Sequence, residues 1–198
     1  MKFIAAPAVA LSLLSFNASA ELLLGAHISK SISGEARAEF DVADFDITED
    51  IDVTDISFFI GSKNDRNNRF LLSYSSVGID FDKSDITEDA VGINFDWQFV
   101  YGKQQLKPYW GIGFGFYSLD EAAILNGTTK EGDGLSGFAF QLQGGAKVSM
   151  ADNVEVDISF RRQAIAWQDI ELDTGFRTET ISTAYVHNSL NAGVAFMF

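Results

Sequence analysis

The sequence contains no cysteine, few basic residues and, after its first twenty residues, no long apolar run. Without cysteine, an exported chain has no disulfides and must be stabilised in another way. A membrane-spanning helix needs about 20 consecutive apolar residues, so we expect no helical membrane protein. Lysine and arginine number 14 against 28 acidic residues. Because such a surface repels nucleic acid, DNA and RNA are not expected as partners.

The first twenty residues have the layout of a secretory signal peptide. Lys2 precedes an apolar stretch from Phe3 to Phe16, and the small residues Ala18, Ser19 and Ala20 follow it. The alternative for this stretch is a short buried helix. We predict a signal peptide over residues 1–20 and one domain over residues 21–198, which is long enough for a sizeable core.

Apolar and polar residues alternate along most of the remaining chain. Between Val91 and Tyr101 the odd positions are apolar and the even positions are glycine or polar, which is the period of two of a strand. Between Trp110 and Phe116, bulky residues alternate with glycine in the same way. The pattern predicts eight strands, at 21–32, 55–63, 69–79, 89–101, 108–119, 136–148, 154–167 and 180–198.

Two eight-stranded barrels fit this pattern, and they differ in which face points inward. A soluble barrel buries its apolar face, whereas a membrane barrel turns that face to lipid. The bulky face includes Phe95, Trp97, Phe99, Trp110, Phe114, Phe116, Phe138, Phe140 and Phe160. An eight-stranded barrel has room inside only for side chains or one small ligand. We therefore predict an all-β fold, an eight-stranded antiparallel up-and-down transmembrane β-barrel.

Aromatic residues near the strand ends agree with a membrane. Trp97 and Tyr101 end one strand and Tyr109 and Trp110 begin the next, all beside one short turn. Amphipathic rings gather at lipid–water boundaries, so we expect these four side chains there. Tyr117 and Trp167 are expected near the opposite rim.

The signal peptide, the alternation of short and long links, and the last phrase NAGVAFMF resemble the small outer-membrane β-barrels of Gram-negative bacteria, the OmpX- and opacity-like group. The resemblance implies a monomer in the outer membrane, in contact with its lipid and lipopolysaccharide. It also implies that the last strand, ending on Phe198, is recognised by the barrel-insertion machinery. Both termini would lie in the periplasm and the long links outside.

The long links carry most of the negative charge. The links at 33–54, 80–89, 119–135 and 168–180 hold 21 acidic and four basic residues. Two of these links contain the phrase DITED, at 46–50 and 85–89. The phrases are interpreted as solvated hairpin tips that continue the strands, or as a surface for divalent cations. In the second case six carboxylates would approach one another: Asp46, Glu49, Asp50, Asp85, Glu88 and Asp89.

One stretch, near the C-terminus, resembles part of an enzyme active site. His187 and Ser189 resemble the catalytic region of outer-membrane lipid A deacylases, in which histidine is the base and serine the nucleophile. No acid follows Ser189, and the parity of both residues matches Asn191, which is expected in the lumen. Ordinary lumen residues are the simpler interpretation. Further charged residues fall on the inferred lumen side of their own strands and predict an internal salt-bridge network: His27, Asp96, Lys147, Glu155, Asp157 and Arg161.

The sequence thus predicts a barrel with a polar, plugged lumen and acidic outer loops, with a structural or surface-interaction role. The alternatives are an enzyme that modifies outer-membrane lipid, centred on His187 and Ser189, and a narrow channel. No catalytic, cofactor-binding or metal-binding residue is assigned.

Overall fold

The computed structural model describes residues 21–41, 45–84, 86–102, 105–120, 122, 134–173 and 178–198, without the side chains of 172 and 173. The predicted signal peptide, residues 1–20, lies outside these ranges and stays a prediction. In the part described, no helix is long and apolar enough to cross a membrane.

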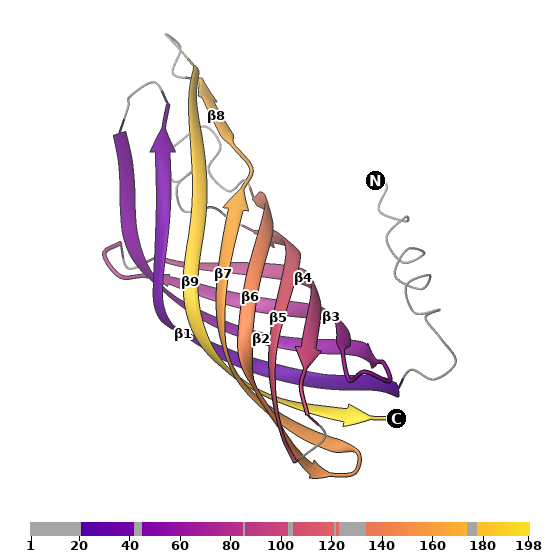
Figure 1. Cartoon of the computed structure of the whole chain (residues 1–198). Coiled ribbons are helices and arrows are strands. Elements are labelled where there is room, and N and C mark those ends of the chain that lie inside the picture. The colour runs from indigo at the N-terminus through magenta and orange to yellow at the C-terminus, as the bar shows by residue number, and fades with distance from the viewer. Residues whose placement is uncertain are drawn as a thin grey trace, which may run out of the picture.

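The fold is an antiparallel β-barrel, as predicted (Figure 1). Each strand pairs with the next along the sheet, and β1 pairs with β9 to close the ring. β8 is a short continuation of the β7 wall that pairs with the start of β9, so the barrel itself has the eight strands expected. The strands are β1 Glu21–Phe40, β2 Phe45–Lys63, β3 Arg69–Phe81, β4 Ile86–Val100, β5 Leu106–Leu119, β6 Leu135–Ala151, β7 Val154–Trp167, β8 Ile170–Asp173 and β9 Thr178–Met197.

The ring closes along a seam between β1 and β9. Pairing runs from Leu23 opposite Met197 to Phe40 opposite Ile181. Beyond it, Leu22 and Phe198 exchange two backbone hydrogen bonds of 3.2 and 3.0 Å. The seam therefore leaves no unpaired edge along the barrel wall there, which lipid requires of a strand-built membrane protein.

The two faces of the wall differ as the alternation predicts. Bulky residues of β4 and β5 point outward and are exposed, with Trp97 at 54% and Phe116 at 57%. Between them, Asn94, Asp96 and Gln98 are buried in the lumen. We call the exposed face, built from such residues on all eight barrel strands, the apolar belt. A continuous apolar belt on a closed barrel matches the hydrocarbon of a bilayer.

One end of the barrel, which we call the turn end, holds the links β2–β3, β4–β5 and β6–β7. Asn67 has a positive φ of 67°, and the Asn64 side chain accepts hydrogen bonds from the N–H groups of Arg66 and Asn68, both at 3.0 Å. These bonds hold the expected short turn. The start of β1 and the end of β9 lie at this same end (Figure 1).

The opposite end, the extended end, differs from the prediction. The link expected at 33–54 is strand up to Phe40 and again from Phe45, and the link expected at 168–180 contains β8. The reason lies in the register, which shifts between Lys30 and Glu35 and then continues to Phe40 opposite Phe45. A bulge of this kind lets a ladder continue in a new direction.

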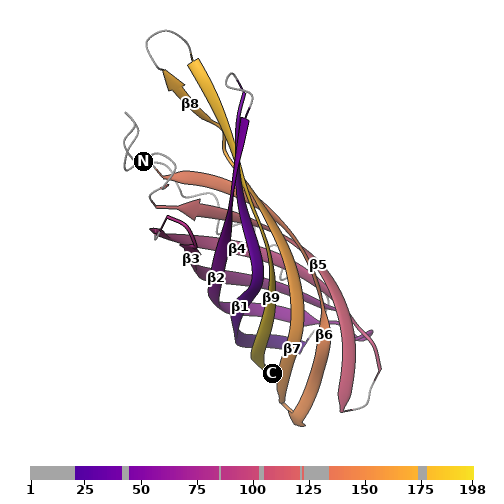
Figure 2. The same cartoon turned by 90° about the vertical axis from the view of Figure 1, so that its left-hand side faces the viewer.

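Four strands consequently rise above the rest of the wall (Figures 1 and 2). We call this part the projecting sheet and define it as residues 35–40 of β1, 45–50 of β2, all of β8 and 178–183 of β9.

Candidate functional site: the lumen and the projecting sheet

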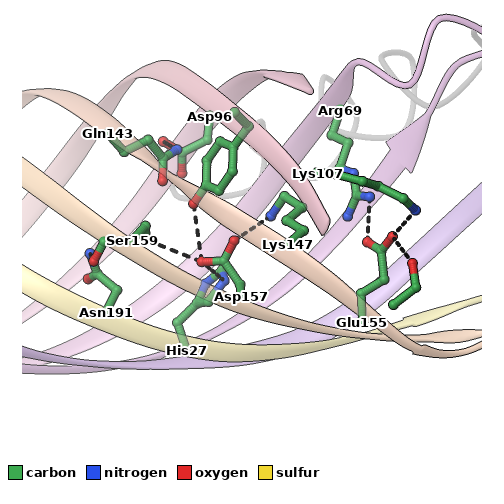
Figure 3. A network of polar contacts seen from close by, with 12 residues as sticks. His27, Arg69, Asp96, Lys107, Gln143, Lys147, Glu155, Asp157, Ser159 and Asn191 are labelled. Atoms are coloured by element: carbon green, nitrogen blue, oxygen red, sulfur yellow. Dashed lines mark hydrogen bonds and ion pairs between the residues drawn. The ribbon is translucent and has the colours of Figure 1, made fainter. Parts of the chain in front are cut away.

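A buried carboxylate ties three strands together near the turn end of the lumen. Glu155 of β7 accepts a hydrogen bond from Arg69 of β3 and one of 2.6 Å from Lys107 of β5. Arg69 and Glu155 are almost wholly buried, at 2% and 1% exposed. Figure 3 shows both cations directed at the one carboxylate. Buried charges must be paired, so this trio fixes the spacing of these walls.

A second carboxylate, Asp157, lies deeper in the lumen (Figure 3). Lys147 donates to its Oδ2 at 2.7 Å, and the Tyr109 hydroxyl donates to its Oδ1 at 3.1 Å. Ser159 adds a hydrogen bond of 3.2 Å, and Nε2 of His27 lies 4.0 Å away. Lys147 also lies over the Tyr109 ring, 4.3 Å from its centroid. Both oxygens of this carboxylate therefore accept hydrogen bonds from partners inside the barrel.

The third part of the network is in the middle of the barrel. Arg161 donates to Asp55 across the lumen at 3.4 Å. Asp96 accepts hydrogen bonds from two glutamines, Gln141 and, at 3.2 Å, Gln143. The predicted salt-bridge network is thus confirmed for Lys147, Glu155, Asp157 and Arg161, whereas Asp96 is bonded to amides. Sequence reasoning missed Arg69, Lys107 and Asp55, although the inward parity of Asp55 could have indicated it.

The lumen is filled by these side chains. A Cβ on Gly113 would collide with the Asp96 carboxylate and the Gln141 amide, so any other residue here would have to displace these lumen side chains. A cavity of about 10 Å³ near the turn end, bordered by His27 and Gln98, leaves room for about one water.

The lumen is not polar throughout, which corrects the prediction. Toward the extended end it holds an apolar cluster of buried side chains, including Ile51, Val53, Val77, Ile79, Leu119, Leu135, Ile165, Trp167, Ile170, Ile181 and Tyr185. We call this cluster the apolar cap. Of these residues, Ile51, Val53, Leu135 and Ile170 lie in the predicted links, and the others lie in the predicted strands, on the inward parity. The prediction of a polar lumen did not take these inward apolar residues into account.

Three aromatic residues expected at the lipid boundary belong to the interior instead. Trp167 is 5% exposed and packs edge-on against Tyr185, with ring centroids 5.5 Å apart. Tyr117 donates a hydrogen bond of 2.9 Å to Asn94, and Tyr109 faces Asp157 as described above. Both tyrosines have the inward parity of the β5 glycines, which decides their direction. By contrast, Trp97, Tyr101 and Trp110 are exposed as predicted, and the Trp110 Nε1–H donates to the Tyr101 hydroxyl at 2.9 Å.

His187 and Ser189 face the lumen, as their parity indicated. They are 4% and 1% exposed, and within the described residues neither His187 Nδ1 nor Ser189 Oγ has a hydrogen-bond partner. On the neighbouring strand β7, Gln163 lies opposite His187 and the cation Arg161 lies opposite Ser189, so neither partner is a carboxylate that could orient the imidazole. A lipid in the bilayer touches the outer face of β9 and not this one.

The two DITED copies lie side by side but have different roles. In the first, Glu49 accepts hydrogen bonds from the backbone N–H groups of Lys83 and Ser84, at 2.7 and 2.8 Å. In the second, Glu88 is not on the surface as expected: it is 3% exposed and accepts a hydrogen bond of 2.8 Å from Tyr185. Its inward parity on β4 explains this.

The structure does not bring the expected carboxylates together as a cation site. Among the described residues no group of three acidic or histidine side chains is placed to hold a metal ion, and Asp85 lies outside them. Asp46 forms an ion pair of 3.1 Å with Arg37. Cation binding at these tips stays a prediction.

Glu49 makes the contact between the two tips dependent on pH. Slight desolvation raises the pKa of the Glu49 carboxyl, but the N–H donors of Lys83 and Ser84 outweigh it and lower this pKa from 4.5. A lowered pKa means that the contact is fully present above pH 4.5 and is lost as the pH falls through the lowered value. We expect the protection of the Lys83 and Ser84 amides against hydrogen exchange, measured relative to the intrinsic exchange rate at each pH, to fall below that pH and to be low at all pH values in Glu49→Ala.

The matched control is Asp50→Asn, because Asp50 contributes only its backbone carbonyl to the neighbouring turn. Exchange that is the same in Glu49→Ala and in the parent would contradict the proposed contact.

The projecting sheet has one apolar and one acidic face. On the inner side, Phe40 and Phe45 stack with centroids 4.5 Å apart, and Phe45 and Ile47 remain about half exposed. The outer side carries two basic residues, Lys30 just below it and Arg37, both in ion pairs. Exposed carboxylates on or beside this face are Glu35, Glu39, Asp46, Asp50, Asp52, Asp169 and Glu171. Within the described strands, residues 45–50 pair only with β1. The turn at 82–84 contacts the other edge at Thr48, Glu49 and Asp50, so this edge is open over residues 45–47.

No protein-family model matches the sequence, and no curated protein sequence matches it. Solved structures do match. Neisserial surface protein A matches with a TM-score of 0.54 and 17% identity, over 89% of this chain and 97% of that one. The outer membrane protein OprG of Pseudomonas aeruginosa matches with a TM-score of 0.42 and 8% identity, over 90% and 96% of the two chains. The first likeness shows a common fold.

The fold and its surface agree on the location. The apolar belt requires a bilayer, and closed antiparallel barrels of eight strands are an architecture of the bacterial outer membrane. The protein is a transmembrane β-barrel of that membrane, as predicted.

Proposed function

We propose that this barrel is a surface protein that presents its projecting sheet to partners outside the cell. The observation that carries the proposal is the exposed pair Phe45 and Ile47 beside an open strand edge, on a sheet that rises above the rest of the wall. An open edge and exposed apolar side chains are what an added strand of another chain uses. A barrel that presents this sheet outside the cell has its extended end outside and its turn end in the periplasm.

A transport role is less well supported by the same structure. Ion pairs fill the lumen from the turn end to the middle, and the apolar cap fills the part beyond it. An eight-stranded barrel leaves no further space for a path. The lipid-modifying alternative is disfavoured in a similar way, since His187 and Ser189 are buried in the lumen, away from lipid.

The charge of the projecting sheet suggests the class of partner. Seven exposed carboxylates on or beside the outer face stand against two paired cations, Lys30 and Arg37. Complementary charge steers association and weakens with salt. We propose a basic polypeptide with apolar side chains, bound in an extended form beside residues 45–47 of β2.

Single thiols test this proposal, because the chain has no cysteine. We expect a membrane-impermeant maleimide to label Thr48→Cys on intact cells and to leave Asp65→Cys, in the turn end, unlabelled. An amphipathic basic peptide should slow the labelling of Thr48→Cys, and added salt should reverse the effect. An acidic peptide of equal length is the control.

Labelling of Asp65→Cys alone would show that the orientation is wrong. Labelling of Thr48→Cys at the same rate with and without the basic peptide would show that the sheet does not bind this class of partner.

A further inference from the structure

A charged side chain interrupts the apolar belt. Arg162 of β7 points outward and is exposed, between the outward residues Phe160 and Ala164 of the same strand. Its partners in the sheet are Leu142 of β6 on one side and Asn188 of β9 on the other. An arginine on the lipid face is costly, and the cost falls only toward the headgroups.

Arg162 differs from the other cations of the barrel. Eight lysine and arginine residues lie in the described strands, and seven of them are within 4.0 Å of a carboxylate. These seven are Lys30, Arg37, Lys63, Arg69, Lys107, Lys147 and Arg161. No described carboxylate lies within that distance of Arg162. In a chain with twice as many acidic as basic residues, this lone cation faces lipid.

Two neutral polar groups lie in line with Arg162. Asn188 is its cross-strand partner, and Ser33 of β1 is in turn the partner of Asn188. The Asn188 Nδ2 donates to the Ser33 Oγ at 3.0 Å, which leaves the hydroxyl proton of Ser33 free to donate outward. Leu190 and Phe160 bound this polar line on the side of the turn end. The three side chains therefore form one patch across β7, β9 and β1.

Counted from the turn end, Arg162 lies about one hydrocarbon crossing along β7. Arg162 is the ninth residue of β7 counted from Val154 at the turn end. A tilted strand crosses the hydrocarbon in about 9–11 residues. The long arginine side chain extends the reach of its charged group further, toward the interface.

We propose that Arg162, with Asn188 and Ser33, binds the phosphate group of a phosphorylated lipid in the leaflet at the extended end. The guanidinium group offers two parallel donors to phosphate oxygens, and the serine hydroxyl supplies a third. A phosphate supplies the negative charge that no carboxylate of the described strands provides. Only the name of the leaflet, the outer one, rests on the orientation proposed above.

Native mass spectrometry of the purified barrel in detergent micelles tests the site, with bisphosphorylated lipid A as the probe. We expect Arg162→Gln to lower the affinity for this lipid about tenfold, the loss of one charge-assisted bidentate contact. Arg162→Lys should bind with intermediate affinity, because it keeps the charge without the second donor. The matched control is Arg66→Gln in the turn between β2 and β3, which should bind as the parent does.

Two further probes identify the source of the phosphate. Lipid A stripped of its phosphates should bind the parent as weakly as intact lipid A binds Arg162→Gln. Inorganic phosphate should not displace the lipid at equal concentration. Equal binding of lipid A with and without phosphate overturns the proposal, as does displacement by inorganic phosphate or unchanged binding by Arg162→Gln. Gel mobility without heating confirms that each variant is folded, and the micelle experiment does not depend on which end of the barrel is outside.

Discussion

Replacing Glu155 with glutamine is expected to reduce the free energy of unfolding by about 3–5 kcal/mol. The carboxylate lies between Arg69 and Lys107, and both the acid and Arg69 are buried. Its removal leaves two cations in the lumen without their common partner. Unfolding in urea, followed by the gel mobility of unheated samples, measures the loss.

The control is Glu35→Gln, which removes an exposed carboxylate from the projecting sheet and should change stability little. A second variant, Arg69→Met with Glu155→Leu, removes both charges of the most buried pair. Replacing a buried pair by apolar groups is often neutral, so this variant should be more stable than Glu155→Gln. A Glu155→Gln variant as stable as the parent would show that the trio does not hold the wall.

Replacing Trp167 with alanine is expected to reduce the free energy of unfolding by a similar amount, about 3–5 kcal/mol. The indole is buried in the apolar cap, packs against Tyr185 and lies so close over Gly137 that a Cβ there would be 2.6 Å from the ring. Its removal leaves a cavity that the closed wall cannot collapse to fill. The same urea titration measures the effect.

Trp97→Ala is the matched control, because this indole is 54% exposed and borders lipid. It should have the smaller effect. Should Trp97→Ala cost as much as Trp167→Ala, the assignment of Trp167 to the interior would be wrong.

The direction of most barrel side chains could be predicted from the sequence. Alternation alone assigns Asp96, Glu155 and Asp157 to the lumen, where the structure places them. It also assigns Tyr109 and Tyr117 to the lumen, on the parity of the β5 glycines. The prediction of a boundary position followed residue type instead, and it was wrong. Gly92 shows how the lumen accepts such a ring, since a Cβ there would collide with Tyr117.

The partners of the lumen charges could not be predicted. Arg69 and Glu155 come from β3 and β7, which are not neighbours in the sheet. Which residues meet across a barrel depends on the tilt and stagger of its strands, and periodicity within one strand contains no information on either. The carboxylate Glu49 is a similar case, because its donors belong to a turn after the next strand.

The projecting sheet was predicted in part. The alternation of Phe45, Ile47, Ile51 and Val53 indicated that the strands continue beyond the bilayer, and they do. The register shift between Lys30 and Glu35 was not anticipated. Gly34 lies in that interval, and an isolated glycine within a strand is a bulge signal. The shift turns Ala36 and Ala38, rather than Glu35 and Arg37, toward the inner side.

The seam between β1 and β9 also determines the order of folding. It joins Leu23 to Met197, so the ring cannot close until its last strand is available. Contacts between residues so distant in the chain form slowly, because nearly the whole polypeptide is the loop that they close. Until then β1 and β9 each expose a long edge, able to pair with any other extended chain. The unclosed chain therefore has to be kept apart from its own copies until the membrane receives it.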